Sequence, residues 1–541
     1  MFYLTSIAQK CEANNLVVEN VSLTDQDTGN DTYDIEFDVS WENSWYIAGA
    51  PSVTANWDAA WVFAKFSTWD GSSWSDWAHA TLLNTGSAAP AGSQISFGQT
   101  GAAYVGAFIY RSSAGTGSND WDNAQLRWDY GTDGVADGAT VKIQVFGIEM
   151  VYIPQGNFYV GDTDCDHNGN IEPSPGGSAA CGTGTAATLI STAITTALCT
   201  DDNNYDNGIE CTDDGDSTGT FCIDGDGGFD LSCDGIDNAS FPTGYEAFYM
   251  MKYEISQGQY VDFLNSLTRT HQNNRTASQS ANQYAMSNSA NVDNRSGIRN
   301  PASIPGGAIT FGCDLDGITA DNTTAGDGTF NESDDGADVA ANFLSWMDGA
   351  AYADWAGLRP FTELELTKAM RGGQVAVDDE YAWGSTTLEP APTSLSNSGE
   401  ANEVPDQGNM NYSSASPDGP FRVGSFADGS STRTNAGAGY YGVLDLSGSL
   451  WERPVTIGNA TGRAFTGSHG DGVLSANGFA TNSDWPGYDG DDVTGATGSG
   501  FRGGSWDISS SHARVSDRSY GAFTVTSRVF NFGFRCARTF P

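Results

Sequence analysis

Residues 350 to 365 read Ala-Ala-Tyr-Ala-Asp-Trp-Ala-Gly-Leu-Arg-Pro-Phe-Thr-Glu-Leu-Glu, and they set the character of the longer part of the chain. Apolar residues at helical spacing run into this stretch from Ala341 to Trp355 and predict one helix. Thr362 and Glu365 form a capping box, in which the hydroxyl accepts from a backbone N–H and the residue three later reaches back. A second helix is therefore predicted from Thr362 through Met370.

The residues around this stretch predict more irregular backbone than regular structure. Ser256-Gln-Gly-Gln259 is another capping box and opens a predicted helix through Leu267. From Tyr381 onward Gly, Asn, Ser and Asp dominate, which favours loops joined by short strands. We therefore expect residues 149–541 to form an α+β domain with a high loop content.

Residues 14–148 show a different pattern of apolar and polar residues. Short runs such as Tyr33–Trp41 and Val141–Phe146 alternate apolar and polar residues, which is typical of strands with one buried face. Regular turn signals between them predict an all-β, immunoglobulin-like sandwich. Five tryptophans of this region fit either a carbohydrate platform or core packing, and packing is favoured: Trp41, Trp57, Trp61, Trp74 and Trp77.

Charge excludes several classes of partner. The 541 residues carry a formal net charge of −45, because Lys and Arg together number only 23. Such a chain repels phosphate backbones and anionic lipid heads, so we expect neither nucleic-acid binding nor membrane insertion. No segment is long and apolar enough to span a bilayer. The acidic, Gly-rich and Lys-poor composition favours an extracellular or cell-surface protein that holds divalent cations.

Two segments leave alternatives open. Residues 1–13 are either the remnant of a signal peptide or an N-terminal strand. The Cys-, Asp- and Gly-rich insertion at 162–241 holds six cysteines for which disulfides are the default, and its acidic runs fit either calcium or solvated loops. These cysteines are Cys165, Cys181, Cys199, Cys211, Cys222 and Cys233.

Seven motifs in order give the C-terminal part a family resemblance. They are Met150–Gly161, Met251–Phe263, Ala350–Glu365 with Arg371-Gly-Gly, Tyr381–Gly384, Tyr441–Glu452, Phe501–Trp506 and Gly533–Arg538. Together they resemble a formylglycine-generating-enzyme/sulfatase-modifying-factor domain, which is a relative of the C-type lectin fold. The resemblance implies that residues 149–541 form one such domain.

The resemblance also implies which catalytic groups are missing. Enzymes of this family use two cysteines that bind copper, and the matching positions here are Ile508 and Ala513. Without a thiolate pair there is neither a soft-metal site nor a redox nucleophile, so we expect a non-enzyme. The family's usual disulfide partner is replaced by Ala353, and Cys536 is expected to pair with Cys313 instead.

One metal site is implied by the same resemblance. In the family, the segment matching Asp445–Glu452 wraps calcium, with ligands at the positions of Asp445, Gly448, Leu450 and Glu452. Two carboxylates and backbone oxygens suit that hard cation. The alternative is a tight turn in which Asp445 caps backbone N–H groups. A second calcium site is predicted at Asn411 and Asp418.

Residues 507–532 use a restricted alphabet. Met, Trp, Lys, Gln and Glu are absent, and these are the amino acids that codons ending in a pyrimidine do not encode. The segment resembles the variable region of proteins targeted by diversity-generating retroelements; the alternative is an ordinary degenerate loop. If the segment is such a variable region, Arg514, Arg518 and Arg528 are expected to be residues that are not varied.

The expected ligand-binding residues mix aromatic and small polar groups, as binding loops of antibodies do. They are Asp507, Ile508, Ser510, His512, Asp517, Ser519, Tyr520, Phe523, Val529, Phe530, Asn531 and Phe532.

These observations predict a secreted or surface-displayed binding protein for an unknown protein or glycan ligand, on a scaffold stabilised by calcium and disulfides. Two alternatives stay open. One is a homo-oligomeric extracellular fibre or surface-layer subunit. The other is an enzyme of unrecognised mechanism around Glu452 or His469.

Overall fold

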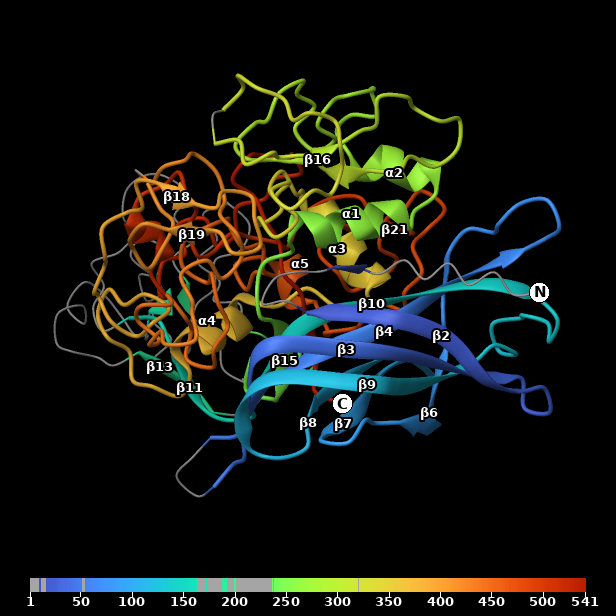
Figure 1. Cartoon of the computed structure of the whole chain (residues 1–541). Coiled ribbons are helices and arrows are strands. Elements are labelled where there is room, and N and C mark those ends of the chain that lie inside the picture. Colours follow the sequence, from blue (N-terminus) through green and yellow to red (C-terminus); the bar gives the residue numbers. More distant parts are fainter. Residues whose placement is uncertain are drawn as a thin grey trace.

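The computed structural model describes residues 9–10, 16–50, 54–162, 171–172, 187–191, 199–200, 236, 238–319, 321–413 and 415–541. Over these residues the chain is mostly β with few helices, and one large sheet runs through it (Figure 1). No described helix is both long enough and apolar enough to cross a membrane.

The large sheet contains twelve strands in the order β1-β2-β3-β9-β6-β8-β4-β10-β15-β22, with β5 paired to β4 and β7 to β8. Its strands are β1 (Gln9–Lys10), β2 (Val17–Asp27), β3 (Thr32–Ile47), β4 (Asn56–Trp69), β5 (Ala78–His79), β6 (Leu82–Ala88), β7 (Ser93–Thr100), β8 (Ala103–Arg111), β9 (Gly115–Asp129), β10 (Thr140–Ile153), β15 (Phe248–Met251) and β22 (Ala537–Thr539).

The sheet closes on itself, because β3 also pairs with β4 through Tyr46↔Trp57 and Ile47↔Asn56. We call β2–β10 the closed sheet. It is antiparallel, as predicted, but it differs from the immunoglobulin-like sandwich expected for residues 14–148, since its strands belong to one sheet. Alternation reports only which face of a strand is buried, and that face is the same in two stacked sheets and in one closed sheet.

Strand β10 carries the sheet into the C-terminal part, residues 149–541. Its residues 140–152 pair with β4, and its last four residues pair with β15, which in turn pairs with β22. The boundary predicted between 148 and 149 therefore lies inside a continuous strand. At the other edge Gln9 and Lys10 of β1 pair with Val18 and Val17.

Five α-helices lie in the described part of the chain: α1 (Gln257–Asn265), α2 (Arg269–Arg275), α3 (Trp346–Trp355), α4 (Glu363–Arg371) and α5 (Ala460–Arg463). The capping boxes of α1 and α4 form as predicted. Helix α3 begins later than the predicted Ala341, because Ser345 and Asp348 make a capping box that fixes its start there.

The remaining elements are short, as the loop-rich composition predicted. They are β11 (Phe158–Val160), β12 (Ile171–Glu172), β13 (Thr188–Ile190), β14 (Cys199–Thr200), β16 (Ile298–Arg299), β17 (Gly312–Cys313), β18 (Leu395–Ser396), β19 (Val404–Pro405), β20 (Tyr488–Asp489), β21 (Asp492–Val493) and the 3₁₀ helix η1 (Ser510–Ala513).

Two apolar cores meet across the large sheet. One fills the closed sheet, where Ile35 and Trp41 are buried. The other joins the closed sheet to the C-terminal part, and there the Phe63 ring lies 5.0 Å from that of Trp355. Core packing is confirmed for Trp41, Trp57 and Trp61, whereas Trp74 and Trp77 are half-buried.

The cysteine predictions have two outcomes. Cys313 and Cys536 are free and buried in the apolar core, so the predicted bond between them is wrong. Burial raises the pKa of both thiols well above the usual value, which keeps them protonated. The predicted disulfides of the 162–241 insertion lie outside the described residues.

Candidate functional site

The predicted ligand-binding segment, residues 507–532, packs beside the predicted calcium loop. Trp451 bridges to Phe532 in parallel, and its backbone N–H donates to the Asn531 carbonyl at 2.9 Å. The loop thereby holds one end of the segment in place.

Aromatic rings form the centre of this face. Trp451 lies 5.3 Å from Tyr520 between ring centroids, and Tyr520 lies 5.9 Å from Phe523. The buried ring of Phe501 lies 4.5 Å from that of Phe532. Only part of this set was predicted from the sequence, because Trp451 and Phe501 lie outside residues 507–532.

Most of the predicted ligand-binding side chains are partly accessible. Asp507 and Phe523 are exposed, and Phe532 is buried in the aromatic cluster, so it supports the face from below. The others are half-buried: Ile508, Ser510, His512, Asp517, Ser519, Tyr520, Val529, Phe530 and Asn531. His512 Nδ1 lies 3.5 Å from Asp517 Oδ1, which brings two of the predicted polar residues together.

The three arginines of the segment bind carboxylates outside it. Arg518 donates two hydrogen bonds to Glu363 of α4, at 2.6 and 2.9 Å. Arg528 does the same to Asp348 of α3, both at 2.7 Å. Arg514 lies 2.8 Å from Asp379. Paired arginine–carboxylate contacts fix geometry as well as charge, so these residues anchor the segment at three points.

The two positions that the resemblance matches to the family's catalytic cysteines hold apolar side chains. Ile508 packs against the cluster of Trp451, Phe501 and Phe532, and Ala513 is buried beside Tyr381. A sulfur–metal site at these positions is excluded by composition, since the sequence has no cysteine between Cys313 and Cys536.

The two residues suggested for an unrecognised mechanism are held in structural contacts. The Thr539 backbone N–H donates to His469 Nε2 at 3.0 Å, and burial lowers the pKa of His469 well below its usual value. Glu452 binds the buried Arg535 guanidinium.

The predicted calcium loop gathers three buried carboxylates. Glu254 was missed from the sequence; it accepts hydrogen bonds from the Ser449 hydroxyl at 2.8 Å and from the Leu450 backbone N–H at 2.9 Å. Asp445 accepts from the Gly424 N–H at 2.6 Å. The signal that could have found Glu254 is its place within the Met251–Phe263 motif, shortly after the end of β15.

These carboxylates disfavour one another's charge. Burial and then the carboxylates of Glu452 and Asp445 raise the pKa of Glu254 well above its usual value. Burial raises the pKa of Glu452 to about 7, although Arg535 lowers it. Burial also raises the pKa of Asp445. The cluster therefore has more negative groups than Arg535 alone compensates, and a bound cation would stabilise their ionised forms.

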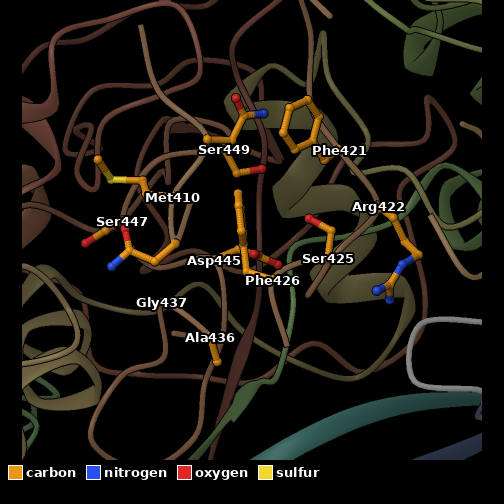
Figure 2. Close-up of a pocket in the computed structure, with 12 residues that line it drawn as sticks. Met410, Phe421, Arg422, Ser425, Phe426, Ala436, Gly437, Asp445, Ser447 and Ser449 are labelled. Atoms are coloured by element: carbon orange, nitrogen blue, oxygen red, sulfur yellow. The ribbon is translucent and has the colours of Figure 1, made fainter. Parts of the chain in front are cut away.

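A small cavity of about 10 Å³ lies against Asp445. Figure 2 shows Asp445 near Ser425, Phe426 and Ser449 in its wall. Asn411 also lines it, so the cavity brings together one residue from each of the two predicted calcium sites. Gly448, Leu450 and Glu452 do not line it. The volume is that of about one water-sized sphere.

Asn411 is tied directly to the loop. Its carbonyl accepts from the Ser449 N–H at 2.9 Å, and a Cβ on Gly448 would lie 2.3 Å from the same oxygen. Gly448 therefore has to be glycine for this contact. Asp418, the other residue of the second predicted site, is exposed and does not line the cavity.

Among the described residues, three further acidic groups lie close enough to hold a metal ion. They are Asp162 with Asp378 and Asp379, Asp314 with Asp316 and Asp327, and Asp316 with Glu332 and Asp335. Of these residues, only Asp162 belongs to the 162–241 insertion, whose acidic runs fit calcium in the sequence analysis.

Comparison with known proteins gives the family. Residues 218–540, more than half of the chain, match the model of the sulfatase-modifying factor enzyme 1-like domain. The chain belongs to this family. Over 114 residues it is 31% identical to the formylglycine-generating enzyme of Mycobacterium tuberculosis, a match that covers 21% of this chain and 32% of that enzyme.

Among solved structures, PvdO from Pseudomonas aeruginosa aligns over 72% of this chain and 94% of its own, with 15% identity and a TM-score of 0.30. The sulfatase-modifying factor enzyme 1-like family includes both catalytic and non-catalytic members, so membership confirms the resemblance and leaves the activity to be argued from the site.

Proposed function

We propose that this protein is a non-catalytic, extracellular or surface-displayed binding protein that presents residues 507–532 to a protein or glycan ligand. One observation carries the proposal. Arg514, Arg518 and Arg528 are anchored to carboxylates outside the segment, while most residues between them are half-buried or exposed. A display surface needs such a division, because its variable residues must change without unfolding the scaffold.

The chemistry of the face supports binding rather than catalysis. Tyr520 and Phe523 supply rigid apolar area, and Ser510, Ser519 and Asn531 supply adaptable hydrogen-bonding groups. The positions that the resemblance matches to the family's reactive thiols hold Ile508 and Ala513 instead.

Calcium is the proposed stabilising ion. Asp445 and Asn411 line the cavity and offer oxygen ligands. Glu452 and Glu254 add negative charge beside Asp445. The resemblance adds the backbone oxygens of Gly448 and Leu450. Two buried oxygens, Asn411 Oδ1 and Glu452 Oε2, have no hydrogen-bond partner within the described part of the chain, and such oxygens fit a hard cation. Calcium would supply positive charge there and fix the loop beside Trp451.

A selection experiment tests the display function. One library randomises Ser510, Ser519, Tyr520, Phe523 and Asn531. A matched library randomises Thr116, Ser118, Asp120 and Asp122, which are exposed in β9. Both are selected against purified serum albumin as a model target. We expect folded binders from the first library alone, and equal recovery from both would contradict the proposal.

The diversification itself is tested at the nucleotide level. We expect a near-copy of the 3′ end of the gene that differs only at adenines, next to a reverse-transcriptase gene. Absence of such a copy would remove diversification from the proposal and leave a fixed binding face.

A further inference from the structure

Three charged residues meet in the interior where the closed sheet continues into the C-terminal part. Asp58 lies on β4, Glu149 on β10 and Lys252 directly after β15, and these strands are neighbours in the large sheet (Figure 1). The Lys252 Nζ atom lies 3.1 Å from Glu149 Oε2 and 3.8 Å from Asp58 Oδ2. All three side chains are at most 4% exposed, so the amine and the two carboxyls face one another with little access for water.

The register of the sheet brings the three side chains together. Glu149 pairs with Ala60 of β4, two residues from Asp58, so the two carboxyl side chains lie on the same face of neighbouring strands. The Lys252 backbone N–H donates to the Glu149 carbonyl at 2.9 Å, which extends the pairing of β10 with β15 by one residue. The amine is covered by the Trp45 ring, whose centroid lies 5.1 Å from Nζ.

Hydrogen bonds give the two oxygens of Asp58 different roles. Oδ1 accepts from the Ser44 hydroxyl at 2.6 Å and from the Trp45 backbone N–H at 3.0 Å. Oδ2 accepts from the Trp41 indole N–H at 2.9 Å and is the oxygen that faces Lys252. Two donors on one oxygen stabilise the negative charge that develops there when a nucleophile attacks a carbonyl carbon. Oδ1 is therefore suited to be the carbonyl oxygen, and Oδ2 the oxygen that leaves.

Burial decides which of the three groups carry charge, because two carboxyls face one amine. Burial raises the pKa of Asp58, although Lys252 and the hydrogen bonds lower it. Burial lowers the pKa of Lys252, but the Glu149 carboxylate and other neighbouring charges raise it above its usual value overall. These shifts favour a starting state in which Asp58 is protonated and Lys252 forms an ion pair with Glu149.

We propose that Lys252 and Asp58 condense to an isopeptide bond in the folded chain, with Glu149 as the proton carrier. Glu149 takes a proton from the ammonium group. The free amine then forms a bond from Nζ to the Asp58 carboxyl carbon, while the carbonyl electron pair moves onto Oδ1.

Release of water completes the reaction. Glu149 gives its proton to Oδ2, the bond between the carboxyl carbon and Oδ2 breaks, and the electron pair on Oδ1 restores the carbonyl. Glu149 then takes the surplus proton from the nitrogen. The products are an amide, one water molecule and a neutral Glu149, so atoms and charges balance without an oxidant or any other reactant.

The bond links the closed sheet covalently to the C-terminal part, since it joins β4 to the residue that follows β15. A cross-link of this kind restricts the unfolded chain, as a disulfide does. It needs no ligand and no contact with residues 507–532, so it is independent of the proposed binding function.

Peptide mapping by mass spectrometry of the unsubstituted chain, denatured and reduced, tests the bond. Condensation lowers the mass of the chain by one water molecule. Chymotrypsin cleaves after aromatic residues, so its digest should contain Asp58–Trp61 joined to Met250–Tyr253 as one branched peptide. The proposal is overturned if these two segments appear only as separate linear peptides.

Substitutions separate condensation from a simple buried ion pair. Lys252→Arg should give no branched peptide, and Glu149→Gln, which keeps the shape but carries no proton, should leave most of the chain uncondensed. Lys65→Arg is the matched control, because Lys65 is another buried lysine near Asp58 on β4 but donates to two backbone carbonyls; it should keep the branched peptide.

Circular dichroism shows whether each variant is folded, and the digest of the unsubstituted chain decides the proposal even where a variant is not. An unchanged yield of branched peptide in folded Glu149→Gln would overturn the role of Glu149 as proton carrier.

Discussion

Strand β4 of the closed sheet pairs continuously with β10 from Trp57↔Tyr152 to Trp69↔Thr140, whereas the longest described helix of the C-terminal part is the ten-residue α3. Backbone hydrogen bonds between long strands hold the first region. The second has few such ladders, and buried ion pairs between arginine and carboxylate side chains connect its loops: Arg275–Asp348, Arg295–Glu403, Arg299–Asp314, Arg359–Glu365, Arg371–Glu380, Arg502–Glu363, Arg518–Glu363, Arg528–Asp348 and Arg535–Glu452.

This difference explains where the scarce basic residues lie. The chain has only 23 Lys and Arg, yet many of its arginines are buried in the C-terminal part. Each guanidinium offers five donors in a planar fork, so one side chain satisfies carbonyls and carboxylates of several loops. Because many of the few basic residues are used in buried ion pairs, they hold the loops of the C-terminal part together. The surface is left with an excess of acidic residues.

The largest effect is expected where one carboxylate serves two arginines. Glu363→Gln removes the charge that pairs with both Arg502 and Arg518 and leaves two buried cations uncompensated. We expect the free energy of unfolding to fall by about 3–5 kcal/mol. Urea denaturation of the variant and the native chain measures the difference.

The matched control lies in the closed sheet. Asp34→Asn removes the partner of Arg127, whose side chain is 32% exposed, and should cost about 1 kcal/mol or less. Equal losses for the two variants would show that the two regions do not differ in how they use charge.

Low pH should lower the stability of the C-terminal part, because its buried ion pairs need ionised carboxylates. Burial alone would raise the pKa of Glu363, but the Arg518 and Arg502 guanidiniums lower it below its usual value overall. The pair therefore contributes its full stability above the unfolded-state pKa, and this is lost as the pH falls through the folded-state pKa. Unfolding followed from pH 7 to pH 3 should show a smaller acid loss in Glu363→Gln than in the native chain. An identical pH dependence would contradict this cause.

Calcium binding should increase the stability of the C-terminal part. At a free Ca²⁺ concentration about 100 times the dissociation constant, binding to the folded state adds about 2.7 kcal/mol. We expect Asp445→Asn to reduce the Ca²⁺-dependent rise in melting temperature and Asp418→Asn to leave it unchanged, because only Asp445 lines the cavity. If chelation by EDTA leaves the native melting temperature unchanged, the calcium proposal fails.

The sequence predicted what is local and missed what depends on distant contacts. The capping boxes at Ser256 and Thr362 were found because their partners are three residues apart. The closure of β3 onto β4 was missed, since alternation does not say which strands pair. In the candidate site, Asp445 and Asn411 were predicted separately, and their meeting in one cavity depends on the path of the intervening loop. Glu254 and Arg535 were missed because they lie far from Glu452 in the sequence.

A smaller effect is expected in the closed sheet, where packing rather than charge is at stake. Ile35 is fully buried in its core, so Ile35→Val should cost about 1 kcal/mol through the lost methylene and the space it leaves. The loss should be the same at pH 5 and pH 7, because no charge changes. Denaturation at both values checks this, and a pH-dependent loss would mean that ionisable groups also hold this region.

The smallest change in the free energy of unfolding is expected for an exposed residue of the 507–532 segment. A buried aromatic neighbour should behave differently. Phe523 is 41% exposed, whereas its neighbour Phe501 is 2% exposed and packs under Arg453. We expect Phe523→Ser to change the free energy of unfolding by no more than about 0.5 kcal/mol. Phe501→Ser should cost about 3–5 kcal/mol, since it opens a cavity in the aromatic cluster. A large loss for Phe523→Ser would make the exposed aromatic residues part of the core, and residues 507–532 would then lack the tolerance to substitution that a diversified binding face requires.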